Sequence, residues 1–102
     1  MMNSYFFIYN SFAGTQEKIR DFLNDMPSII HWRYDMPGMF YVVSEKNAND
    51  LLREFEERSR LANVPNAKYV FSEYNGNAQG RLTKGSWHLL NKKEVLKEEA
   101  ED

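Results

Sequence analysis

The side chains best suited to metal or acid-base chemistry in this 102-residue chain are two histidines, His31 and His88. Neither has a second histidine or a carboxylate at a recognised metal-ligand spacing. The chain has no cysteine, which excludes disulfides, thiolate ligands and a thiol nucleophile. We therefore predict no metal site and interpret both histidines as structural or solvent-facing.

Motifs for nucleotide hydrolysis and covalent catalysis are absent from the sequence. Residues 10–14, Asn-Ser-Phe-Ala-Gly, lack the lysine and the glycine spacing of a phosphate-binding loop. No serine lies in the context of a nucleophile elbow, and no spaced carboxylate pair is recognisable as an acid-base couple. We assign no catalytic residue and no cofactor, and we favour a non-catalytic protein.

Charge is nearly balanced over the chain but uneven along it. Thirteen basic and fifteen acidic residues give a net charge of -2, which biases the whole chain toward neither nucleic acid nor anionic membrane. Between Tyr74 and Lys93, however, no residue is acidic, and Arg81, Lys84 and Lys92 also lie in this segment. This basic strip is able to contact phosphate, although an ordinary solvated loop and helix end has the same composition.

Hydrophobic patterns predict the elements that would position these residues. Runs of aromatic, β-branched and other apolar residues are typical of strands, and we predict strands at 4–12, 29–34, 39–44 and 68–74. The turn-forming residues 35–38 predict that the middle two strands form an antiparallel hairpin.

Helical spacing of apolar residues predicts three helices. The first follows Thr15 and stops before Pro27, and the second is capped by Asn47 or Asn49. Ser86 is the expected cap of a short C-terminal helix.

The order strand, helix, strand, strand, helix, strand is the split βαβ arrangement. We predict a single α+β domain over residues 1–96, a ferredoxin-like βαββαβ sandwich with a four-stranded antiparallel sheet, two helices on one face and the short C-terminal helix. Residues 97–102 are expected to be an acidic, frayed tail.

The sheet face without helices is predicted to be apolar, because the strands carry large side chains on both sides. We predict that an aromatic set forms an interface or platform there: Tyr5, Phe7, Tyr9, Tyr41 and Phe71. The C-terminal segment with Trp87, a second copy of the chain, or stacked nucleobases are the candidates to cover it. A slip of one residue in strand register would exchange the two faces.

Two strand segments resemble the paired signatures of an RNA-recognition motif. They are residues 6–11, Phe-Phe-Ile-Tyr-Asn-Ser, and residues 38–43, Gly-Met-Phe-Tyr-Val-Val. In that family the second signature begins with a basic residue and carries two stacking aromatics, whereas this chain has Pro37, Met39 and Tyr41. The resemblance implies a single-strand platform that lacks one ring and one phosphate contact.

The chain from residue 4 to residue 90 also resembles the SinR-type small proteins, relatives of the CRISPR-associated adaptation-subunit nucleases. The similarity lies in the Tyr-Phe-Phe-Ile-Tyr-Asn start, an amphipathic helix, Trp32, the Phe-Tyr-Val-Val strand and Trp87. It implies a ferredoxin-like dimer. The nucleases of this group hold a divalent metal with an aspartate at the end of the first strand, where this chain has Asn10. A neutral amide is a poor Mg²⁺ ligand, so the resemblance implies the ferredoxin-like fold and the dimer rather than metal-dependent cleavage.

We expect a non-catalytic binding domain that forms a homodimer or joins a protein partner through the aromatic face. The alternative is a nucleic-acid binding or processing protein, a degenerate nuclease among them. Its platform would hold Tyr9, Asn10 and Tyr41, and its phosphate contacts would come from Arg33, Arg81 and Lys84.

The longest uncharged apolar stretch near the start, Tyr5 to Tyr9, is far shorter than the ~20 residues that a membrane span requires, so no membrane association is expected. The lack of cysteine suits a reducing compartment, and we predict a cytoplasmic location.

Overall fold

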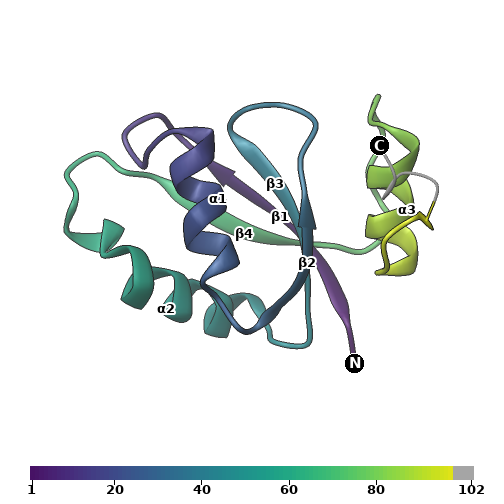
Figure 1. Cartoon of the computed structure of the whole chain (residues 1–102), viewed down its shortest axis with the longest axis horizontal. Helices are drawn as coiled ribbons and strands as arrows, with labels where there is room; N and C mark the ends of the chain where they lie inside the picture. Colours follow the sequence, from purple (N-terminus) through teal and green to yellow (C-terminus); the bar gives the residue numbers. More distant parts are fainter. Residues whose placement is uncertain (98–102) are drawn as a thin grey trace.

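The computed structural model describes residues 1–97, so the acidic tail predicted at 97–102 lies outside the described residues apart from Lys97. It is an α+β structure with one four-stranded antiparallel sheet (Figure 1). The elements in chain order are β1 (Asn3–Tyr9), α1 (Gln16–Asn24), β2 (Ile29–Arg33), β3 (Met39–Ser44), α2 (Ala48–Ser59), the 3-10 turn η1 (Leu61–Asn63), β4 (Tyr69–Tyr74) and α3 (Lys84–Lys92).

Polar caps fix where the helices begin. The predicted caps of the first two helices are confirmed: Thr15 accepts a hydrogen bond from the Lys18 amide at 3.2 Å, and Asn47 accepts one from the Asp50 amide at 2.8 Å. The predicted cap of the third helix is wrong. Thr83 caps α3, because its hydroxyl accepts a hydrogen bond from the Ser86 amide at 3.3 Å, and Ser86 lies buried in the first turn.

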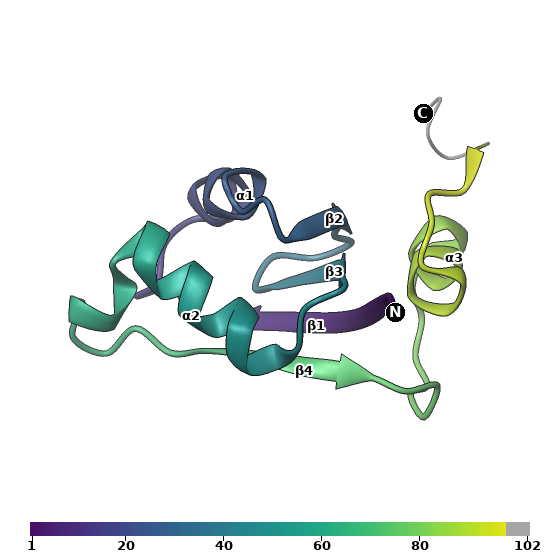
Figure 2. The same ribbon diagram turned by 90° about the horizontal axis from the view of Figure 1, so that it is seen from below.

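The strands stand in the order β2-β3-β1-β4, so β1 and β3 are central while β2 and β4 are edges. Seen along the sheet in Figure 2, the strands follow one another in this order. The pairing of β1 with β4 runs without interruption from Ser4 with Tyr74 to Tyr9 with Tyr69. The pairing of β2 with β3 is irregular between Ile29 and His31.

Helices α1 and α2 cover one face of the sheet (Figures 1 and 2). The main core lies between them and the strands, where the Phe7 ring packs at a tilt against those of Phe71 and Phe55, with ring centroids 4.5 and 4.8 Å apart. Ile19 and Leu23 of α1 pack into the same cluster.

This core corrects the predicted faces. Tyr5, Phe7, Tyr9 and Phe71 were expected on the face without helices, but they lie beneath α1 and α2 with 0 to 8% of their surface exposed. Every residue of β1 from Tyr5 to Tyr9 is large and apolar, so alternation marks two faces without telling which one the helices cover. These four side chains are unavailable to a partner in the folded chain.

The other face of the sheet carries α3 at one end (Figure 2). A second core forms there from Tyr41 and Val43 of β3, Tyr74 of β4, and Leu89 and Leu90 of α3. Of the predicted face residues, Tyr41 alone lies on this side, and it is fully buried. The C-terminal segment is therefore what covers this part of the sheet.

Candidate functional site

The predicted phosphate-contacting residues come together at the start of α3. The Arg33 side chain reaches across from β2, and its Nε donates to Ser86 Oγ at 2.9 Å while Nη2 donates to Thr83 Oγ1 at 3.3 Å. Lys84 is the first residue of α3, and Arg81 lies two residues before the Thr83 cap. Arg81 and Lys84 are both exposed, so their charges face solvent.

Asp35 also binds the N-terminal end of α3. Its carboxylate accepts hydrogen bonds from the Thr83 hydroxyl at 2.9 Å, the Thr83 amide at 3.2 Å and the Tyr41 hydroxyl at 3.3 Å. Burial alone would raise the pKa of Asp35, but hydrogen bonds, chiefly from Thr83, outweigh it and lower this pKa below its ordinary value. Burial and the nearby negative charge of Asp35 raise the pKa of Tyr41. Arg33 and Asp35 therefore take part in one polar network that anchors α3.

A hollow of about 240 Å³ lies beside this network. Its apolar wall includes Phe6, Met39, Leu82 and Trp87, and Arg81 stands at its edge. Trp87 and Phe6 are only partly buried, so aromatic surface and a cation meet in one place. Sequence analysis named Trp87 and Arg81 separately but had no means of joining them, because the loop that brings them together has no local pattern.

Beyond α3, residues 1–97 leave the same sheet face uncovered. Ile8 of β1 is directly paired with Met39 of β3 and with Val70 of β4, and these three side chains form what we call the apolar strip. Ile8 is 40% exposed and Val70 is 49% exposed, while Met39 is partly buried. Sequence analysis assigned Tyr9, the next residue along β1, to the open face, whereas Ile8 is the residue that lies there.

Asn10 lies apart from this site, at the far end of β1. Its side-chain amide donates to the Asn66 carbonyl at 2.9 Å, and its carbonyl accepts from the Lys68 backbone amide at 3.1 Å. The Asn10 backbone amide also donates to the Lys68 carbonyl at 3.0 Å, which lengthens the β1–β4 ladder. Both halves of the amide are therefore used to join two chain segments.

We predict that Asn10→Asp destabilises the fold by about 1–2 kcal/mol, because a carboxylate has no donor for the Asn66 carbonyl and faces its oxygen instead. Urea unfolding followed by circular dichroism measures the change. Asn63→Asp, at an exposed position of η1, serves as the control and should change stability far less. An unchanged midpoint for Asn10→Asp would contradict the bridging role.

The metal-binding residues of the described chain form no cluster. Among residues 1–97, no three histidine, aspartate or glutamate side chains are grouped so as to hold a metal ion. His88 Nε2 lies 3.4 Å from Glu94 Oε1, on α3 and the turn that follows it. His31 lies on β2, opposite Val43.

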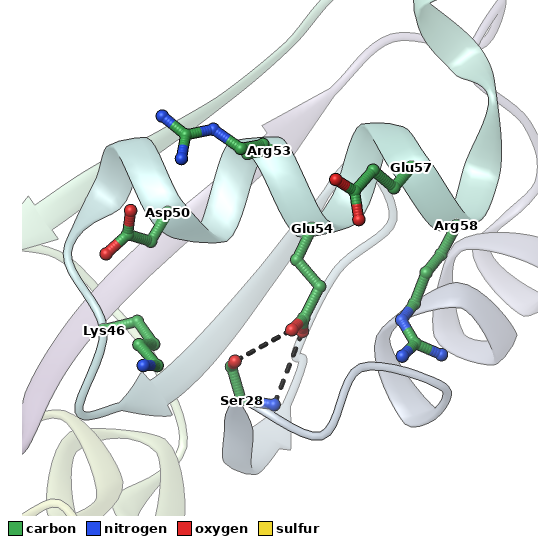
Figure 3. Close-up of a pocket in the computed structure, with 7 residues that line it drawn as sticks. All are labelled: Ser28, Lys46, Asp50, Arg53, Glu54, Glu57 and Arg58. Atoms are coloured by element: carbon green, nitrogen blue, oxygen red, sulfur yellow. Dashed lines mark hydrogen bonds between the residues drawn. The ribbon is translucent and has the colours of Figure 1, made fainter.

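A second hollow, of about 330 Å³, is polar and lies beside α2 (Figure 3). Its lining residues are Ser28, Lys46, Asp50, Arg53, Glu54, Glu57 and Arg58. The Glu54 carboxylate accepts from the Ser28 hydroxyl at 2.9 Å and from the Ser28 amide at 3.4 Å. This lining contains three cations and three carboxylates, so it has no excess charge to attract a charged ligand. The hydrogen bonds from Ser28 to Glu54 join α2 to the segment just before β2.

Comparison with known proteins adds no identification. No protein-family model, no curated protein and no solved structure matches this chain. No helix within residues 1–97 is long and apolar enough to cross a membrane.

Proposed function

We propose that this chain is a non-catalytic binding domain that self-associates through the apolar strip formed by Ile8, Met39 and Val70. The observation that carries the proposal is the exposure of Ile8 and Val70, which are paired across β1 and β4 and are 40% and 49% exposed. β1 is a central strand, where side chains on a packed sheet are normally covered. A solvated apolar strip in the middle of a sheet is stabilised when a second surface removes it from water.

The chemistry of the strip suits a protein partner better than a stacked base. Its three side chains are aliphatic or thioether groups, which pack against other apolar side chains but offer no aromatic plane. Tyr9 and Tyr41, which the nucleic-acid alternative required as a platform, are buried on opposite faces of the sheet.

A second candidate function is single-strand nucleic-acid binding at the start of α3. The observation that favours it is the grouping of Arg81 and Lys84 beside the hollow lined by Phe6 and Trp87, with Arg33 on the same helix end. Such a site would place a base in the hollow and phosphates on the exposed cations. Asn10 lies at the far end of β1 and takes no part in this version of the site.

We also propose that the domain is ferredoxin-like and is related to the SinR-type small proteins. The alternation of strands and helices and the order β2-β3-β1-β4 support the first proposal. The two hydrogen bonds made by Asn10 support the view that this relative keeps a structural amide where the nucleases keep a metal ligand. The cytoplasmic location stays a prediction.

Light scattering on the purified chain tests the proposed self-association. We expect a dimer mass for the wild type and a monomer mass for Ile8→Lys, because a charge in the strip opposes its burial. Ile30→Lys is the matched control, since Ile30 is 44% exposed but lies on the opposite edge strand. This control should remain a dimer.

Either of two results would contradict the proposal: a monomeric wild type at every concentration, or equal behaviour of the two lysine variants. The same measurement with a pool of single-stranded RNA and DNA tests the second candidate. A gain in mass that disappears at high salt, and that is absent in the Arg81→Ala/Lys84→Ala double variant, would favour nucleic-acid binding instead.

A further inference from the structure

The hollow beside Trp87 is built by three separate parts of the chain. Phe6 and Met39 come from the sheet, Trp87 comes from α3, and Leu82 comes from the loop over residues 75–83 that joins β4 to α3 (Figure 2). All four side chains are partly buried. The packing of these elements on one another therefore gives the hollow an apolar lining that is open to solvent on one side.

The volume of the hollow, about 240 Å³, limits the size of what it can hold. Pockets for drug-sized molecules usually measure roughly 300–1,000 Å³, so this one suits a smaller body such as a short hydrocarbon chain. Methionine side chains are unbranched and adapt to the shape of what they contact, and both Met36 and Met39 line the hollow. A small apolar body would remove part of this lining from water.

The charge of the lining comes from one residue. Among residues 1–97, Arg81 is the one charged residue that lines the hollow, and it is exposed at the edge. Within the same residues no hydrogen bond or ion pair engages the Arg81 side chain, whereas Arg33 donates to Ser86 and Thr83. A guanidinium group presents a planar pair of donors that matches a carboxylate. One uncompensated cation beside an apolar lining is complementary to a monoanion with an apolar body.

We propose that this hollow binds a small carboxylic acid with an apolar body, whose carboxylate pairs with Arg81 and whose body lies against Trp87. The inference goes beyond the proposed self-association, because Ile8 and Val70 do not line the hollow. It also names a different occupant from the single-strand candidate. A nucleobase has polar edges that need partners, and within the described residues Gln79 is the one side-chain amide of the lining.

Titration of the wild type with hexanoate tests this site, followed by the indole N–H signals of the two tryptophans in NMR spectra. We expect the Trp87 signal to move until it saturates. The Trp32 signal should stay in place, because Trp32 packs on the helix-covered core and its Nε1 donates to Asn24 Oδ1 at 2.6 Å. Hexylammonium has the same chain with the opposite charge, and acetate has the charge without the chain. Both should move the Trp87 signal far less at equal concentration.

Reversing the charge at the edge of the hollow tests the role of Arg81. Arg81→Glu should weaken hexanoate binding about fivefold, because the loss of an exposed ion pair is joined by repulsion. The same variant should bind hexylammonium better than hexanoate, an exchange of preference that a merely structural role of Arg81 would not produce. Lys84→Glu is the matched control, since Lys84 is exposed and has the same charge but does not line the hollow. It should keep hexanoate binding close to that of the wild type.

Three results would overturn this inference: a Trp87 signal that hexanoate leaves unmoved, equal shifts with hexanoate and hexylammonium, or equal hexanoate affinities of Arg81→Glu and Lys84→Glu. A Trp87 signal that ignores hexanoate but moves with the single-stranded pool would overturn it in favour of the nucleic-acid candidate. Ile8→Lys separates the inference from the proposed function. This variant should bind hexanoate as the wild type does, whether the wild type is a dimer or a monomer, and a loss of binding would overturn the assignment to the hollow.

Discussion

Phe7→Ala is expected to destabilise the fold by about 3–5 kcal/mol, the cost typical of removing a buried phenylalanine from a core. Phe7 is fully buried in the middle of β1, and its ring centroid lies 4.5 Å from that of Phe71 and 4.8 Å from that of Phe55. Neither neighbour is free to fill the space, because each is held by further ring contacts such as that of Phe55 with Tyr69, whose centroids are 5.3 Å apart. Denaturant unfolding measures the loss, which is large against the whole stability of a domain of this size.

The adjacent residue provides the control for this prediction. Ile8 points to the opposite face and is 40% exposed, so Ile8→Ala should cost less than about 1.5 kcal/mol. If Phe7 lay on an exposed interface and Ile8 in the core, Ile8→Ala would reduce the stability more than Phe7→Ala. A folded Phe7→Ala monomer of near-normal stability would show that the faces are as the sequence suggested, and it would refute the core described above.

Asp35→Ala is expected to cost about 1–3 kcal/mol and to release α3 from the sheet, because it removes the acceptor of one buried donor and two exposed donors. The donors are the Tyr41 hydroxyl, fully buried beneath α3, and the backbone amide and hydroxyl of Thr83. Two further bonds hold the other end of α3, from Ser4 Oγ to the Leu90 carbonyl and from the Tyr74 hydroxyl to Asn91 Oδ1. We therefore expect loosening to begin at the first turn, where amide exchange should rise most.

Lowering the pH should weaken the contact of Asp35 with α3 in the wild type, because it protonates the Asp35 carboxylate. Because the pKa of Asp35 is lower in the folded chain than in the unfolded chain, its contribution is fully present above the ordinary pKa near 3.8. It is lost as the pH falls through the lower folded value. Asp35→Asn should lack this part of the acid dependence, while Asp21→Ala, in an exposed ion pair with Arg20, should keep it. Equal acid dependence in wild type and Asp35→Asn would contradict the anchoring role.

The sequence alone predicted the four strands and three helices in their order, although it did not predict η1 and extended the first strand to residue 12, past the end of β1 at Tyr9. The strand at 39–44 has the predicted bounds, and the caps Thr15 and Asn47 begin the helices that follow them. Each of these features depends on interactions within a few residues, such as a cap and the amide three positions later, so the local sequence is enough to specify them.

Only the tertiary structure decided which face of the sheet became the core. β1 is apolar on both sides, and the choice depends on where α1 and α2 pack, which no alternation along one strand encodes. Both sides carry polar residues: Ser4 and Ser72 lie on the same side as Ile8, and Asn3 and Glu73 lie on the same side as Tyr5. The number of polar residues along β1 and β4 therefore does not tell which side the helices cover.

The candidate site was also decided by tertiary structure. Asp35 and Thr83 are 48 residues apart, and Arg33 and Ser86 are 53 apart, so no spacing along the chain points to their meeting. β4 is likewise an edge strand only because, among residues 1–97, β1 is its one strand partner. Local sequence specified the pieces, and long-range packing decided which surfaces were left for a partner, because burial depends on neighbours that are distant in the chain.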